Sequence, residues 1–162
     1  ETKGHLGASI YLRDIEGVAK GPPPPVDLAA ERRNGDFVRA QIQSGAVSAC
    51  HDLSDGGLAV ALAEMALAGA CGADISEGAP SSKGSPDNPP LAAWLFGEDQ
   101  ARYLVTTGAA PALLAAAEQA GVPARAIGRT GGNSLILAGG EAISLAELRA
   151  GHEGWLPNYM AR

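Results

Sequence analysis

The spacing of apolar residues predicts that helices and strands alternate along the first half of the chain. Residues 27–44 place apolar side chains on one side of a helix, with Asp27 at the N-cap and Gly45 as the C-terminal stop. Residues 46–51 form a short apolar run that is typical of a buried strand. Apolar residues then recur at helical spacing, so a second helix is expected over 56–69.

The second half of the chain continues this alternation with shorter elements. Ser144 and Glu147 have the spacing of a capping box, which predicts a short last helix. The tail, 152–162, has no periodicity, yet its large apolar residues are expected to pack against something. The other expected elements are strands at 72–75 and 102–107, a helical turn at 91–96, a helix from Pro111 through Ala120, and a hairpin of strands 124–129 and 134–138 joined by residues 130–133.

Two stretches are expected to connect elements rather than to form them. Residues 22–25 are consecutive prolines, which favour a stiff extended connector. Residues 76–90 are rich in Gly, Ser and Pro and poor in apolar residues, so they are expected to be a mobile loop. Since no repeat or domain boundary interrupts the pattern, the sequence predicts one mixed α/β domain.

Composition narrows the class of protein without identifying it. The 162 residues are 46% hydrophobic and 19% charged, which is typical of a globular domain. A net charge of −6 argues against nucleic acid as the main partner, because binding a phosphate backbone needs clustered Lys and Arg. No apolar stretch approaches membrane-spanning length, and Cys50 and Cys71 lack metal-ligand spacing. We therefore expect a cytoplasmic protein that binds neither membrane nor nucleic acid.

The run from His51 to Leu58 places polar side chains and two glycines where a strand gives way to a helix. Ser54 and Asp55 suit the N-cap, and the glycines Gly56 and Gly57 would let a ligand approach backbone N–H groups that have no partner in the helix. Such a helix start attracts anions, while Asp52 could hold a cation such as Mg²⁺. The simpler alternative is a capped turn with one stabilising carboxylate, and caps far outnumber ligand sites.

A second polar segment, Leu95–Tyr103, sets two carboxylates, an amide and a guanidinium directly before a predicted strand. Polar groups at the entrance of a strand can face a ligand crevice, although a charged surface loop is the commoner outcome. His51 could act as a general base, but a histidine that ends a buried strand is more often only hydrogen-bonded in place. The residues alone thus suggest a ligand-facing edge built from 51–57 and 97–102, without a complete active site.

Taken together, three segments resemble the C-terminal domain type of the aminoimidazole-ribonucleotide-synthetase superfamily. They are the long motif at 51–66, the segment Leu95–Tyr103 and the opening residues 4–12. The Asp-Gly-Gly-Leu sequence that continues into an Ala-rich helix favours the purine-biosynthesis branch over the other members. Residues 151–157 are also similar to the natural C-terminus of that branch.

The resemblance implies a single three-layer α/β/α domain with one mixed sheet over residues 1–162, forming a fragment of a larger enzyme. That enzyme would be an ATP-dependent ligase in which ATP phosphorylates the amide oxygen of formylglycinamide ribonucleotide and ammonia then displaces phosphate. The implied cofactors are ATP and Mg²⁺. The implied partners are a glutaminase subunit, which supplies ammonia, and the nucleotide-binding and C-terminal-type domains of the same polypeptide.

The resemblance also implies which residues form a site. Since the chain is similar to the second of two copies of this domain, its site would be an auxiliary nucleotide site without catalytic residues, and the isolated domain is expected to be inactive. Asp99 would add negative charge beside Glu98, which is unfavourable for phosphate unless a metal is present. The alternatives are a structural or interface domain, a binding module, and a domain of another superfamily member that acts on a phosphorylated metabolite. The expected metal ligand is Asp52, and the expected substrate- or nucleotide-binding residues are Ser54, Gly56, Gly57, Glu98, Asp99 and Gln100.

Overall fold

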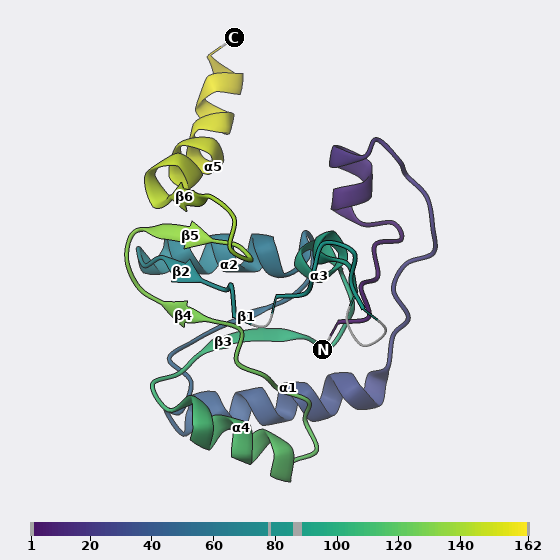
Figure 1. Cartoon of the computed structure of the whole chain (residues 1–162), viewed down its shortest axis with the longest axis vertical. Helices are drawn as coiled ribbons and strands as arrows, with labels where there is room; N and C mark the ends of the chain where they lie inside the picture. Colours follow the sequence, from purple (N-terminus) through teal and green to yellow (C-terminus); the bar gives the residue numbers. More distant parts are fainter. Residues whose placement is uncertain (1, 78, 86–88, 162) are drawn as a thin grey trace.

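The computed structural model describes residues 2–77, 79–85 and 89–161 (Figure 1). Its helices are the short π-helix η1 (Tyr11–Ile15), α1 (Leu28–Gln43), α2 (Gly57–Gly69), α3 (Leu91–Phe96), α4 (Ala110–Gln119) and α5 (Leu145–Met160). Its strands are β1 (Ala49–Asp52), β2 (Ala73–Asp74), β3 (Tyr103–Thr106), β4 (Arg129–Thr130), β5 (Ser134–Ile136) and β6 (Ala142–Ser144). In this part of the chain, no helix is long and apolar enough to cross a membrane.

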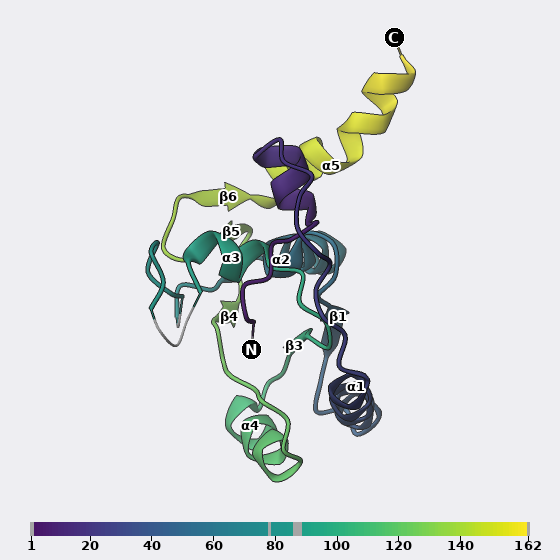
Figure 2. The same ribbon diagram turned by 90° about the vertical axis from the view of Figure 1, so that its right-hand side faces the viewer.

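The strands form two hydrogen-bonded ladders. β1 pairs antiparallel with β3, while the other strands form a mixed sheet in the order β4-β2-β5-β6, in which β2 runs parallel to β5. Helices α2 and α3 lie on one side of the β1–β3 pair and α1 and α4 on the other (Figures 1 and 2). The mixed α/β class is therefore confirmed, with the correction that the strands are shared between two ladders instead of forming one sheet.

The hairpin expected from 124–129 and 134–138 is wrong. β4 is much shorter than expected, and β2 inserts between β4 and β5 and pairs with both. Glycines permit this insertion: the backbone of Gly72 exchanges hydrogen bonds with Gly131 and Gly132, and a Cβ atom on Gly72 would lie 2.2 Å from the Ser134 carbonyl oxygen. Because β2 is distant in sequence, its insertion could not be inferred from the turn residues alone.

The core is built around α2. Its alanines allow neighbouring elements to approach closely, and its leucines pack against α3 and the strands that follow. Each leucine buried in this way stabilises the fold by about 1.5–3 kcal/mol. The buried cluster comprises Leu58, Ala59, Leu62, Ala66, Ala73, Ile75, Trp94, Leu95 and Leu135.

Local signals placed several helix ends correctly. The Asp27 carboxylate accepts hydrogen bonds from the N–H groups of Ala29 and Ala30, which confirms it as the N-cap of α1. The capping box of Ser144 and Glu147 also forms. In the expected loop at 76–90, residues 78 and 86–88 lie outside the described residues, and the remainder forms no helix.

The last helix is longer than expected, since α5 continues through the tail to Met160. Leu145 and Leu148 pack against the core, and the Arg149 guanidinium donates to the Leu67 carbonyl oxygen over 3.2 Å. The C-terminal half instead projects beyond the rest of the molecule (Figures 1 and 2), and its large apolar residues are exposed, so what they are expected to pack against does not lie among the described residues.

Candidate functional site

The turn at 52–57 joins β1 to α2 and is fixed by backbone hydrogen bonds. The Leu53 N–H donates to the Arg102 carbonyl oxygen (2.9 Å), and the Gly57 N–H donates to the Ser54 carbonyl oxygen (3.0 Å). The expectation that Ser54 or Asp55 caps the helix is wrong, because the N-cap is Gly56. Its φ of +76° is a left-handed conformation that favours glycine, and it makes no side-chain cap of its own.

A carboxylate from a distant part of the chain completes this cap. The Glu98 Oε1 atom accepts hydrogen bonds from the Gly56 N–H and the Ile10 N–H, each over 2.9 Å. The Glu98 N–H in turn donates to the His5 carbonyl oxygen (3.0 Å). One acidic side chain therefore ties the N-terminal segment to the start of α2, where a negative charge is favoured by the helix dipole.

The same two segments are also in steric contact. Gly57 has a φ of +62°, and a Cβ atom there would lie 2.6 Å from the Gly97 carbonyl oxygen and 2.9 Å from the Phe96 carbonyl carbon. Only glycine therefore allows α2 to begin against the end of α3. The structure thus brings the 51–57 and 97–102 segments together, as the sequence suggested.

Asp99 is held in a nearly buried ion pair. Its Oδ2 atom accepts hydrogen bonds from the Thr2 hydroxyl and from Arg102 Nη1, the latter over 3.1 Å, and both charged side chains are about one-tenth exposed. Burial raises the pKa of the Asp99 carboxyl, but the Thr2 hydroxyl and the Arg102 charge outweigh it and bring the pKa below its ordinary value. Burial also lowers the pKa of Arg102. The negative charge that Asp99 adds beside Glu98 is thus compensated within the chain by Arg102.

Helix α1 fixes the end of this polar segment at Ala101, which adopts a φ of +62°. The Ala101 N–H donates to Glu31 Oε1, and the Ala101 carbonyl oxygen accepts from Asn34 Nδ2, both over 2.9 Å. Sequence reasoning missed Glu31, Asn34 and Thr2 because each is at least 67 positions away in sequence from the residue that it contacts. The one available signal in the sequence was that Glu31 and Asn34 are polar residues on the inner side of α1.

Asp52, the expected metal ligand, lies at the end of β1 with a side chain 67% exposed. His51 is beside it, with Nδ1 3.6 Å from Asp52 Oδ1 and Nε2 3.0 Å from Glu64 Oε2. Within residues 2–77, 79–85 and 89–161, no group of three His, Cys, Asp or Glu side chains could hold a metal ion. One exposed carboxylate fits a Mg²⁺ ion that arrives bound to phosphates better than a resident ion, since Mg²⁺ commonly takes one or two protein carboxylates together with phosphate oxygens.

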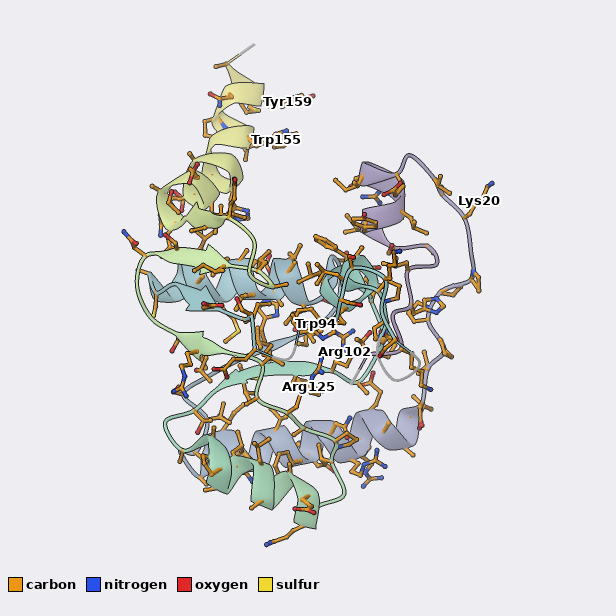
Figure 3. All side chains as sticks on the ribbon, viewed as in Figure 1. Lys20, Trp94, Arg102, Arg125, Trp155 and Tyr159 are labelled. Atoms are coloured by element: carbon orange, nitrogen blue, oxygen red, sulfur yellow. The ribbon has the colours of Figure 1, made fainter. Side chains whose placement is uncertain are left out.

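Ser54 and Gln100 are exposed, and Gln100 borders a cleft of about 1900 Å³ together with Asp99 and Arg102. In the middle of the molecule (Figure 3), the Arg125 guanidinium carbon lies 5.5 Å from the ring centre of the buried Trp94, at the cation–π distance. The expected site residues therefore divide into two groups. Glu98, Asp99, Gly56 and Gly57 make internal contacts, whereas Asp52, Ser54 and Gln100 remain open to solvent.

Comparison with known proteins agrees with this arrangement of motifs. Residues 1–140 match the protein family described as "AIR synthase related protein, C-terminal domain". The chain belongs to this family. Helix α5 lies beyond the residues that match the family.

Individual relatives extend the comparison over the whole chain. A protein of Parvibaculum lavamentivorans named "Phosphoribosylformylglycinamidine synthase subunit PurL" is 60% identical over 166 residues, covering 99% of this chain. The chain spans only 21% of that relative's length.

Solved structures share the fold. "T. maritima PurL complexed with FGAR" superposes with a TM-score of 0.68 at 22% identity, covering 90% of this chain and 25% of that one. "T. maritima PurL complexed with ATP" gives a TM-score of 0.61 at 21% identity, covering 76% and 22% of the two chains.

Proposed function

We propose that this chain is one domain of a larger ATP-dependent carbon–nitrogen ligase of purine biosynthesis, phosphoribosylformylglycinamidine synthase. The observation that carries the proposal is the 60% identity to a subunit of that name over 99% of the chain. Two structural neighbours, T. maritima PurL in complex with FGAR and with ATP, are consistent with it.

The proposed reaction has two steps, each carried out by the larger enzyme. The amide oxygen of formylglycinamide ribonucleotide takes the γ-phosphoryl group of ATP, releasing ADP. Ammonia then adds to the carbon that bears this phosphorylated oxygen, and phosphate leaves from that carbon, giving the amidine. We propose that a glutaminase subunit supplies the ammonia, that Mg²⁺ accompanies the nucleotide to neutralise phosphate charge, and that the enzyme acts in the cytoplasm.

Within this enzyme the domain has an auxiliary role. The proposed nucleotide site at Ser54, Gly56, Gly57, Glu98, Asp99 and Gln100 combines two functions. Glu98 and Asp99, with the two glycines, hold the turn in place through the contacts described above. Ser54 and Gln100 are open to contact a ligand, and Asp52 is placed to supply one oxygen ligand to nucleotide-bound Mg²⁺. The second candidate is a purely structural domain, which is favoured by the number of polar groups already paired inside the chain.

The test is made in the complete polypeptide that contains this sequence. With ammonia as the nitrogen donor, the purified polypeptide should convert formylglycinamide ribonucleotide in an ATP-dependent reaction, whereas the 162-residue chain alone should not. Absence of ATP-dependent product from the complete polypeptide would refute the proposed activity.

One variant separates the auxiliary site from the structural alternative. Asp52→Ala should reduce Mg²⁺-dependent nucleotide retention by the complete polypeptide, because it removes the exposed carboxylate at the end of β1 that is proposed to bind the nucleotide's Mg²⁺. Asp36→Ala is the matched control, since Asp36 is also an exposed aspartate but lies on α1, where it pairs with Arg32 and Arg39. If both variants retain nucleotide equally well, the domain is structural.

A further inference from the structure

The C-terminal half of α5 presents an apolar face that this chain leaves uncovered. Trp155, Leu156, Tyr159 and Met160 are between 57% and 75% exposed. Their spacing, two adjacent pairs four positions apart, puts them on one side of the helix. The rings of Trp155 and Tyr159 stack with their centres 5.3 Å apart, so the two aromatic side chains form one continuous surface (Figure 3).

We propose that this α5 face, made of Trp155, Leu156, Tyr159 and Met160, docks against another domain of the same long polypeptide. This inference rests on the proposed function, in which the chain is one domain of a larger synthase. To the proposed function the inference adds the surface through which the domain contacts another domain, and it specifies that the partner surface is apolar.

The comparisons indicate why the occupant belongs to the synthase. The match to the AIR synthase-related family covers residues 1–140 and does not include α5. The match to the synthase relative nevertheless covers 99% of the chain and therefore includes α5. This chain accounts for only 21% of that relative's length, leaving about four-fifths of the relative to supply a partner surface. The helix thus lies outside the family match but inside the match to a much longer polypeptide.

The size of the face distinguishes a partner domain from a second copy of the chain. With about 150–250 Å² for a fully exposed large side chain and roughly 60% exposure, the four residues together offer roughly 500 Å². A stable interface between separate molecules buries about 800 Å² on each partner, so this face is too small to hold two copies together. A domain in the same polypeptide needs less area, because the covalent connection keeps its effective concentration in the millimolar range.

The attachment of α5 also suits docking. Leu145 and Leu148 anchor its first turns to the core, and Arg149 bonds to the end of α2, so the helix leaves the domain in a fixed direction. The outer turns are stabilised only within the helix, for example by the pair of Arg149 with Glu153. A patch of this size is at the upper end of the largest apolar patch on a typical monomer, about 300–600 Å², and such a patch is often functional.

The test compares backbone hydrogen exchange of residues 150–160 in the 162-residue chain and in the complete polypeptide. Docking should slow exchange of this segment about tenfold or more in the complete polypeptide, since an aromatic anchor in an interface is typically worth that much. The double variant Trp155→Ala/Tyr159→Ala should return exchange to the rate of the 162-residue chain. The matched control is Leu28→Ala, because Leu28 is 77% exposed but lies at the start of α1, at the opposite end of the molecule (Figure 1); it should leave the protection intact.

Three outcomes decide the proposal. Equal exchange in the 162-residue chain and the complete polypeptide would overturn it. Protection that arises in the 162-residue chain as its concentration increases would also overturn it, by assigning the face to a second copy. Protection in a complete polypeptide that lacks synthase activity would support docking while the proposed function fails, so the two failures are distinguishable. Circular dichroism of each variant verifies that α5 still forms.

Discussion

Removal of the Glu98 carboxylate tests whether one side chain joins the two motifs of the candidate site. In Glu98→Ala, the N–H groups of Ile10 and Gly56 lose their common acceptor. Each hydrogen bond to a charged group contributes about 1.5–3 kcal/mol, but the site is only part-buried and water can replace part of the loss. We therefore expect the free energy of unfolding to fall by about 2–4 kcal/mol. Glu98→Gln keeps an oxygen acceptor and loses only the charge, so about 1 kcal/mol is expected.

Urea unfolding of the 162-residue chain, followed by circular dichroism, measures these differences. In a chain of this size, each kcal/mol also lowers Tm by about 2–4 °C. Glu118→Ala, on the exposed surface of α4, is the matched control and should change stability by less than about 0.5 kcal/mol. The reasoning is refuted if Glu98→Ala is as stable as this control, or if Glu98→Gln is as unstable as Glu98→Ala.

Two further predictions concern the same junction. Gly57→Ala should lower the free energy of unfolding by about 2 kcal/mol or more, because the new Cβ meets the Gly97 carbonyl oxygen and the left-handed φ is strained. The control Gly69→Ala, where a Cβ would meet nothing within 4 Å, should be neutral or stabilising. Equal effects of the two variants in urea unfolding would contradict this explanation. Asp99→Asn should cost about 3 kcal/mol at pH 7 by leaving Arg102 buried without its partner. The lowered pKa of Asp99 means that its stabilising effect is present above the ordinary carboxyl pKa and is lost as pH falls through the folded-state pKa, so the difference from wild type should shrink below about pH 4 in unfolding measured against pH. The surface variant Asp36→Asn should show little difference at either pH, and a cost that persists at low pH for Asp99→Asn would contradict the ion-pair explanation.

The parts of the fold that sequence reasoning predicted correctly depend on local interactions. The Asp27 cap of α1 and the capping box at 144–147 each form within four residues, so the sequence contains all of their partners. The start of α2 was predicted to within one residue, but its N-cap was misassigned, because the carboxylate that accepts from the Gly56 N–H, Glu98, is 42 positions away. The hairpin was likewise mispredicted, because the strand that separates its two halves precedes them by more than 50 residues.

The sequence predicted which segments form the candidate site, but not which partners their side chains contact. The sequence correctly predicted that the 51–57 and 97–102 segments lie together. The polar residues of the first segment follow a strand, and those of the second directly precede one. The direction in which each carboxylate points is set by groups on other elements. Asp99 faces Thr2 and Arg102, while Ala101 is held by Glu31 and by Asn34 of α1.

This pairing gives the motif a structural role that does not depend on the auxiliary role proposed for the domain. Glu98 accepts a hydrogen bond from Gly56, whose left-handed conformation favours glycine. Gly57 gives α2 the space to begin against the end of α3. These residues are therefore required for the fold whether or not a ligand binds. Asp52 has no such structural contact beyond its neighbour His51, and its side chain is exposed. Substitution of Asp52 should thus leave stability unchanged, and any effect on nucleotide retention would report ligand binding alone.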